Sequence, residues 1–246
     1  MSTVLIENRS VMQIEVNGGG PVCSELTAQL GNAIDQAEDL GPDAIMLIHL
    51  AGHVDSAAVR PWPGQIDVQS VHKWERVLRR IERSNLATIL FVEHACSAVA
   101  LDLLVVADRR LAGRDFFAPS PISCGSVWPG MTLFRLARQI GESGARKVAL
   151  AADGVSAQRG IELRIIDEII DVGTDGAGRT ARLLRNAPPE NFAIARRLMQ
   201  DSLSTSFDEA LGAHLAACDR ALRRSSSVEF EKAHECDARG VAFARS

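Results

Sequence analysis

The chain of 246 residues contains no tyrosine, and aromatic residues make up only 4% of it. Proteins that bind single-stranded nucleic acid stack its bases on aromatic side chains, so this composition argues against that class. The chain also lacks a strong charge of either sign: its 27 basic and 31 acidic residues are interleaved and give a formal net charge of −4. Because no stretch concentrates the positive charge that would bind a nucleic-acid backbone or an anionic membrane, we expect neither partner.

The sequence is equally poor in the features of secreted, membrane and metal-binding proteins. Its five cysteines are an odd number without CxxC spacing, and no apolar run approaches the roughly 18 residues of a membrane span. The first residues, MSTVLIENRS, lack the basic and then apolar layout of a secretion signal. His49 and His53 have no evident third ligand, so no metal site is expected. These absences favour a cytoplasmic protein whose cysteines are reduced thiols.

Apolar runs are abundant, and hydrophobic residues make up 46% of the chain, enough for a sizeable core. DAIMLIHLAG (43–52) and ATILFV (87–92) are typical of buried parallel strands. A helix with Ser24 as its N-cap precedes the first, and a helix from Asp67 with one apolar face precedes the second. This alternation predicts an α/β fold in which loops at the strand ends carry the chemistry.

The ends of the chain differ in character. Two short β-rich runs, 3–7 and 11–16, predict a hairpin or two adjacent strands, and Ser156 begins a capped helix that leads into the strand-like IIDEIIDV. After Pro188-Pro189 the composition changes to amphipathic helices. We therefore predict a core over 1–187 and a helical region over 188–246. Further helices are expected over 131–140, 142–151, 190–202, 206–224 and 228–238.

Four stretches in this order resemble the crotonase (enoyl-CoA hydratase/isomerase) superfamily. The first stretch resembles that family's helix and strand, followed by a glycine-rich turn that opens a buried helix. The second resembles the family's Pro-Gly turn and the helix that follows it. The third resembles the family's later Gly-Leu-Val-Asp segment, and the fourth resembles its terminal segment. They are VHKWERVLRRIERSNLATILFVEHACSAVALDLLVVADRRLAGRDFFA (71–118), GSVWPGMTLFRLARQIG (125–141), SAQRGIELRIIDEII (156–170) and CDARGVAFAR (236–245).

The resemblance implies a crotonase-type ββα spiral core and a helical C-terminal oligomerisation region that builds homotrimers or hexamers. It implies a coenzyme A thioester as substrate and no covalently bound cofactor. In the family, two backbone N–H groups hold the thioester oxygen as it becomes an enolate. Carried onto this chain, that oxyanion hole falls at Val99 and near Ala57. Phe243 and Arg245 match the terminal motif and would touch the adenine end of coenzyme A.

The same register places Asp102 where family hydratases carry a glutamate used in acid/base work. The second family glutamate would fall within APSPIS (118–123), which contains no acid, so Ser120 or Ser123 would at most orient water. The glycine turn has become Ala98-Val99-Ala100, which removes the steric allowance for a close backbone approach. Arg164 stands where the family has glycine.

Two alternatives stay open for each remaining candidate side chain. Asp102 is either an acid/base or a structural group paired with Arg109 or Arg110. His94 is either a substrate contact or a satisfied structural histidine, and Trp128 either lines an acyl pocket or packs in the core.

Three further features allow two interpretations each. Cys96, near a helix start, is either reactive or buried and inert, and the arginines of 76–83 either meet coenzyme A phosphates or form a solvated face. The loop 52–66 either closes over a ligand or is disordered.

A narrower resemblance concerns the pathway. WPGM (128–131) after SPISCGS, together with KWERVLRRIE (73–82), is similar to divergent crotonase-like proteins that accompany a type III polyketide synthase in making 3,5-dihydroxyphenylacetyl-CoA, the dihydroxyphenylglycine precursor. Such a protein helps to dehydrate and aromatise the cyclised polyketide. The sequence therefore predicts an acyl-CoA hydratase/dehydratase of secondary metabolism. The alternative is a catalytically degenerate partner that stimulates a type III polyketide synthase or a related crotonase.

Overall fold

The computed structural model of the chain describes residues 1–6, 9–41, 43–51, 66–97, 99–123, 126–151, 153–171, 176–185, 187–188 and 192–223. The chain divides into two compact units, Met1–Ala193 and Ile194–Ser246. The boundary expected after residue 187 lies shortly before this division. Each unit is described by itself below.

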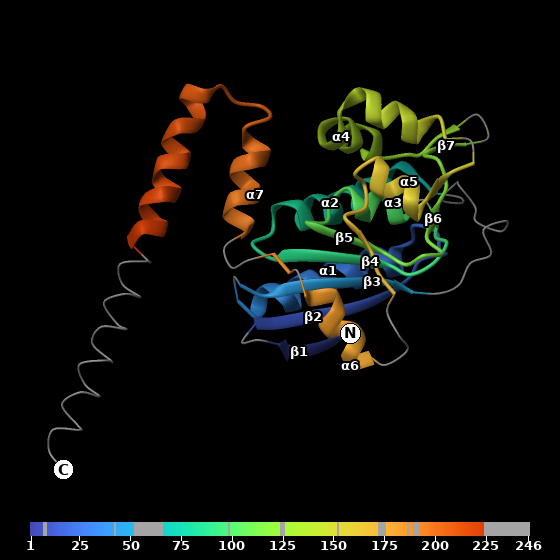
Figure 1. The fold of residues 1–246 in the computed structure, drawn as a ribbon, viewed down its shortest axis with the longest axis horizontal. Helices are drawn as coiled ribbons and strands as arrows, with labels where there is room; N and C mark the ends of the chain where they lie inside the picture. Colours follow the sequence, from blue (N-terminus) through green and yellow to red (C-terminus); the bar gives the residue numbers. More distant parts are fainter. Residues whose placement is uncertain are drawn as a thin grey trace, which may run out of the picture. The chain divides into compact units, whose positions relative to one another are not determined.

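A six-stranded sheet forms the centre of the first unit, in the order β1-β2-β3-β4-β5-β10. β1 and β2 form the expected hairpin and pair antiparallel, and all later pairs are parallel. The first five strands of this sheet follow one another along the chain, from blue to green in Figure 1, whereas β10 comes later in the chain. Their bounds are Ser2–Ile6, Arg9–Asn17, Ile45–Ala51, Ala87–Val92, Arg109–Ala112 and Glu168–Ile169.

Both faces of this sheet are covered, which explains why β3 and β4 are buried and almost entirely apolar. Alternate residues of a strand point to opposite faces. Met46 and Ile48 accordingly belong to the larger core cluster, and Ile45 and Leu47 to a smaller one that Leu183 of helix α6 (Gly176–Leu184) completes. The α/β fold with buried parallel strands is confirmed.

Three helices of the first unit, α1, α2 and α5, begin after a residue whose side chain accepts a capping hydrogen bond. Asp67 caps α2 as expected, because its Oδ1 accepts the Ser70 N–H at 2.7 Å. The expectation for α1 is wrong by one residue: Cys23 has extended backbone geometry and its Sγ accepts the Leu26 N–H, so Ser24 is already helical. The helices are α1 (Ser24–Asp39), α2 (Val68–Arg83), α3 (Val99–Leu104), α4 (Thr132–Ala149) and α5 (Ala157–Glu162).

Two backbone positions explain features of the sequence pattern. α4 joins the two helices expected over 131–140 and 142–151, which meet at a kink where Gly141 has φ 73°. Arg164 has φ 59°, and it is the one non-glycine residue with positive φ in the described ranges. Left-handed backbone is strained for a residue with a Cβ atom. A glycine, which the resemblance to the family implies for this position, would relieve that strain.

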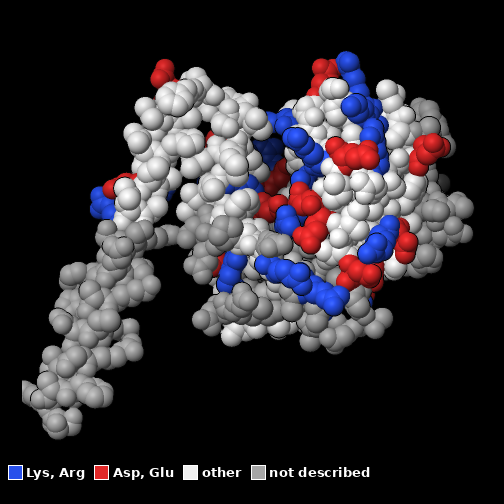
Figure 2. All heavy atoms as spheres, viewed as in Figure 1, with Lys and Arg blue, Asp and Glu red and all other residues white. Residues whose placement is uncertain are grey.

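Charged side chains of both signs alternate on the surface drawn in Figure 2. Ion pairs join Arg110 of β5 to Asp167, directly before β10, at 2.6 Å, and Arg109 of β5 to Glu168 of β10 at 2.8 Å. In the part of the chain that the structure describes, no helix is long and apolar enough to cross a membrane.

Within the described residues, the second unit contains most of α7 (Phe192–Asp201) and a helix over 207–223. These helices agree with the ranges 190–202 and 206–224 expected from sequence, whereas 228–238 lies outside the described residues. Large apolar side chains remain exposed on the second helix: Phe207, Leu211, Leu215 and Leu222. At 3.6 residues per turn these four share one face.

Gly113 provides a test of the packing around the end of β4. A Cβ atom there would lie 2.1 Å from the Glu93 carbonyl oxygen, so the backbone would have to move. We expect Gly113→Ala to lower the free energy of unfolding by about 1–3 kcal/mol, measured by urea denaturation. Gly31→Ala is the matched control: nothing lies within 4 Å of that site in α1, so alanine should stabilise the helix by roughly 0.5–1 kcal/mol. Equal effects would contradict this packing.

Candidate active site

The turn before α3 is held by the glycine-rich loop that follows β2. The Ser97 N–H donates to the Gly18 carbonyl oxygen at 2.7 Å, and the Ser97 hydroxyl donates to the Gly20 carbonyl oxygen at 2.9 Å. The Gly18 N–H in turn donates to Ala51, the last residue of β3, at 2.9 Å. These bonds bring the end of β3 and the start of α3 to the same place.

Val99 is the first residue of α3, where backbone N–H groups have no acceptor within the helix. Its side chain is buried, and its service as an oxyanion donor stays a prediction. Ala57 lies outside the described residues, as does nearly all of the loop 52–66. Phe243 and Arg245 also lie outside them.

Asp102 lies in α3 and is completely buried. The indole N–H groups of Trp74 and Trp128 both donate to its Oδ2, each at 2.8 Å. The Thr132 hydroxyl donates to Oδ1. Since Trp74 lies in α2, Trp128 precedes α4 and Thr132 begins α4, the carboxyl group joins three segments around α3.

These donors leave the two oxygens of Asp102 unequal. A carboxylate oxygen can accept about two hydrogen bonds. Oδ2 therefore has both positions filled by indoles, whereas Oδ1 has one filled by Thr132. Among the contacts that the structure describes, the free acceptor position of this carboxyl is on Oδ1.

Burial raises the pKa of Asp102 from 3.8 to about 6, because the charged form loses its hydration. The hydrogen bonds from Thr132, Trp74 and Trp128 act in the opposite direction, and the charge of Glu75 adds to the increase. A carboxyl group with a pKa in this range can exchange a proton near neutral pH.

The structural alternative that paired Asp102 with an arginine is wrong. Arg109 bonds to Glu168, and Arg110 bonds to Asp167 through its backbone N–H and its guanidinium. The reason is that both arginines lie on β5, next to β10 in the sheet. Asp102 instead accepts hydrogen bonds from the neutral side chains of Trp74, Trp128 and Thr132.

An ionic network lies beside this carboxyl. Arg135 of α4 is 2.8 Å from Glu75 Oε2 and 2.9 Å from Glu82 Oε1, both on α2. Glu75 Oε1 also accepts the Met131 N–H at 2.7 Å, directly before α4. These bonds join α2 to α4, the helices whose Trp74 and Thr132 donate to Asp102.

The segment in which the resemblance places a second glutamate, APSPIS (118–123), contains no acid, and the structure shows what its serines contact. Ser120 is buried; its hydroxyl donates to the Ala149 carbonyl oxygen at 2.7 Å and accepts the Ile122 N–H at 3.2 Å. These bonds give the Ser120 hydroxyl a structural role in the described structure. Ser123 lies in β7 (Ile122–Ser123), which pairs with β8 (Ser126–Val127). That Ser123 orients a water molecule stays a prediction.

His94 follows β4 and is partly exposed, with its Nε2 3.8 Å from Glu93 Oε1. Glu93 also accepts from His49 at 2.9 Å, and burial lowers the pKa of His49 below its ordinary value. Arg179 approaches the same carboxylate at 3.5 Å. Alternate residues of β3 share a face, so His49 lies on the same face as Ile45 and Leu47 of the smaller core. The His49 side chain is therefore on the face of the sheet opposite Met46 and Ile48.

The Cys96 thiol is buried, and its Sγ donates to the Phe117 carbonyl oxygen at 3.2 Å. Burial raises the pKa of this thiol far above the neutral range. The inert alternative for Cys96 is therefore supported, since the thiolate is the reactive form.

Two residues of this arrangement were not expected from sequence. Trp74 lies in the helix from Asp67, for which the sequence predicted only an apolar face, and Thr132 received no role, yet both donate to Asp102. A signal did exist, because a buried indole N–H requires an acceptor and a buried acid requires donors. For Trp128 the structure supports core packing, since its side chain belongs to the larger core cluster and is 4% exposed.

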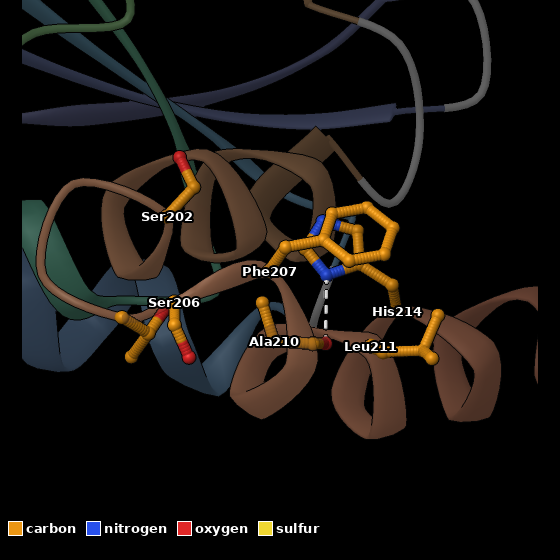
Figure 3. A pocket seen from close by; sticks show the side chains of 7 residues that line it. Ser202, Ser206, Phe207, Ala210, Leu211 and His214 are labelled. Atoms are coloured by element: carbon orange, nitrogen blue, oxygen red, sulfur yellow. Dashed lines mark hydrogen bonds between the residues drawn. The ribbon is translucent and has the colours of Figure 1, made fainter.

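A separate pocket of about 380 Å³ lies in the second unit (Figure 3). Phe207, Ala210 and Leu211 give it an apolar lining, and the His214 ring faces it, with Nδ1 3.0 Å from the Ala210 carbonyl oxygen. Ser202, Thr205 and Ser206 contribute its polar lining.

Comparison with known proteins shows the family to which the chain belongs. The chain is 35% identical over 215 residues to an enoyl-CoA-hydratase of Amycolatopsis orientalis, covering 87% of this chain and 97% of that protein. No family model matches the chain.

Solved structures share the fold at low identity. An enoyl-CoA hydratase/isomerase family protein of Silicibacter pomeroyi has a TM-score of 0.71 at 15% identity, covering 91% of this chain and 99% of that one. An enoyl-CoA hydratase of Thermoplasma volcanium has a TM-score of 0.67 at 18% identity, covering 90% and 92%. The chain belongs to the crotonase (enoyl-CoA hydratase/isomerase) superfamily.

The raised pKa of Asp102 predicts a pH-dependent stability. A group whose pKa is higher in the folded state stabilises the fold fully below its unfolded pKa, here 3.8, and loses that contribution as pH rises through about 6. The amide introduced by Asp102→Asn would accept both indole N–H groups and donate to Thr132, so this variant should fold without the titration.

We expect the free energy of unfolding of wild type to fall relative to Asp102→Asn by about 2 kcal/mol between pH 4 and pH 6. Urea denaturation at a series of pH values measures this difference. A difference that stays constant over the whole range would contradict the assignment.

Proposed function

We propose that the chain binds acyl-CoA thioesters and acts on them by hydration or dehydration of the crotonase type. Membership of the enoyl-CoA hydratase/isomerase superfamily supports a function of this general type. The observation that carries the finer proposal is the Asp102 carboxyl, buried in α3 with one acceptor position of Oδ1 unfilled.

In this proposal the thioester oxygen binds the backbone N–H groups of Val99 and of the loop that contains Ala57. Such preorganised donors stabilise the negative charge that develops on the oxygen in the enolate. The anchoring of the α3 turn on Gly18 and Gly20 supports the proposal, because it fixes the turn that presents Val99.

Asp102 then serves as the single acid/base. In a dehydration, Oδ1 accepts the proton from the carbon next to the thioester carbonyl, and the electron pair moves into the enolate. The enolate re-forms the carbonyl as the carbon–oxygen bond at the next carbon breaks. The same proton passes from Oδ1 to the departing hydroxyl and makes water, which leaves a carbon–carbon double bond and an ionised Asp102. A pKa of about 6 suits both halves of this cycle.

The substrate that we propose is a cyclised polyketide thioester, dehydrated and aromatised to 3,5-dihydroxyphenylacetyl-CoA. The support is the resemblance of WPGM (128–131) and KWERVLRRIE (73–82) to crotonase-like proteins of that pathway. A type III polyketide synthase or a related crotonase would then be its functional neighbour.

A second candidate function is a non-catalytic partner that binds and stimulates such a synthase or crotonase. The observation in its favour is that Asp102 is completely buried and already accepts three hydrogen bonds. The Ser120 hydroxyl, at the place of the second acid, is bonded to the backbone. A protein that kept the fold for assembly would retain such a carboxyl as a structural group.

We also propose that the chain assembles as a homotrimer or hexamer through the second unit. Phe207, Leu211, Leu215 and Leu222 leave one face of the 207–223 helix apolar and exposed. A large exposed apolar patch marks an interaction surface in soluble proteins.

Replacing Asp102 with Asn tests the acid/base role. Turnover of a 3-hydroxyacyl-CoA should fall by at least about 100-fold, because proton transfer by a positioned side chain contributes on that scale. Binding of the same thioester, measured by calorimetry, should be unchanged, since Asn keeps the contacts of the buried group.

Asp35→Asn is the control, because this carboxylate of α1 is 61% exposed and pairs only with Arg80 in the described structure. It should retain turnover. Full activity in Asp102→Asn would remove Asp102 from the mechanism, and a wild-type chain that neither binds nor converts thioesters would favour the partner role.

The assembly is tested by placing a charge on the apolar face. Leu215→Glu should convert a trimer or hexamer to monomer in light scattering coupled to gel filtration, because burial of the carboxylate in an interface is unfavourable. Arg220→Glu, a charge reversal at an exposed position on the other side of the same helix, should leave the assembly intact. A wild-type chain that is monomeric would overturn the proposal.

A further inference from the structure

We propose that Trp74 and Trp128 are positioning residues that confine proton exchange by Asp102 to its Oδ1 atom and favour the charged form of the carboxyl. This inference deepens the proposed function, because it names the groups that would set the acid strength of its acid/base. Neither indole needs to touch a substrate for this role.

The argument begins with the chemistry of the donors. An indole N–H donates a hydrogen bond and cannot accept one. Two indoles at 2.8 Å from Oδ2 therefore occupy both acceptor positions of that oxygen, and a proton could bind there only if an indole bond broke.

Thr132 differs from the two indoles, and this difference decides where the proton goes. A threonine hydroxyl can donate or accept. When Asp102 is ionised, the hydroxyl donates to Oδ1; when Oδ1 carries a proton, the hydroxyl can rotate and accept it. Protonation at Oδ1 thus leaves all three partners satisfied, whereas protonation at Oδ2 does not.

Burial makes these bonds effective. Trp74 is 1% and Trp128 4% exposed, so water cannot replace the carboxylate as the acceptor of either N–H group. A buried N–H without an acceptor is unfavourable, and both indoles therefore favour the form of Asp102 that accepts from them best, the carboxylate. They oppose the loss of hydration that favours the neutral acid.

The charged groups around Asp102 do not replace this effect. From α2, Glu75 opposes ionisation of Asp102, and Glu82 lies two helical turns further along the same helix. From α4, Arg135 is bound to both glutamates and offsets their charge. In the turn before α3, burial keeps the Cys96 thiol neutral. In the described structure the groups that favour the carboxylate by direct bonds are the two indoles and Thr132.

The test measures the titration of Asp102 itself. Carbon-13 NMR of protein labelled at the aspartate carboxyl carbon follows each titration, and the signal missing from Asp102→Asn assigns residue 102. Trp74→Phe and Trp128→Phe should each raise the midpoint by about one pH unit, since a hydrogen bond to a charged group contributes on this scale. The pH profile of thioester turnover should shift by the same amount.

Leu78→Ala is the matched control, because Leu78 is fully buried in α2, one turn from Trp74, and gives Asp102 no hydrogen bond. It should destabilise the protein without moving the titration. If either phenylalanine variant does not fold, benzothienylalanine incorporated in place of tryptophan keeps the ring shape and replaces N–H with sulfur. It should raise the midpoint further than a single substitution.

An Asp102 midpoint that stays in place in the variants that lack the N–H groups, or that moves equally in Leu78→Ala, would overturn the inference. The NMR titration needs no turnover, so the two claims fail separately. Loss of the proposed function would appear as absent thioester binding and conversion in wild type, with the titration shift still present.

Discussion

The hydrogen bonds of one buried carboxyl group hold together the part of the fold in which chemistry is expected. Asp102 accepts from α2 through Trp74, from the segment before α4 through Trp128, and from α4 itself through Thr132. An acid in an apolar helix is costly without such partners, and here the partners come from segments that must meet around α3. The same bonds that satisfy the charge thus fix the local packing, and Arg135 with its two glutamates fixes the neighbouring helices.

Much of this fold could be predicted from the sequence because its signals are local. The apolar runs that became β3 and β4, the Asp67 cap and the glycine at the α4 kink each depend on neighbours in the chain or on a repeating pattern. The misplaced cap of α1 shows the limit: Cys23 is a less common capping residue than Ser24, and only the backbone angles distinguish them.

The site was less predictable because its contacts join distant residues. The register with the family located Asp102, but nothing local shows that Trp74 and Trp128, 28 and 26 residues away, would donate to the same oxygen. The arginines next to the α3 end were closer in sequence and were the wrong partners, because strand pairing directs them to Asp167 and Glu168. Sequence distance is a poor guide where a sheet and several helices converge.

The central claim is that a thioester ligand meets the free acceptor position on Asp102 Oδ1. Calorimetric titration of wild type and Asp102→Asn with a non-reactive acyl-CoA analogue at pH 6, in buffers of different ionisation enthalpy, counts the protons exchanged on binding. A ligand at Oδ1 changes the proton affinity of the carboxyl, so the account predicts a linked proton exchange in wild type that is absent from Asp102→Asn. Equal proton counts in the two proteins would contradict it.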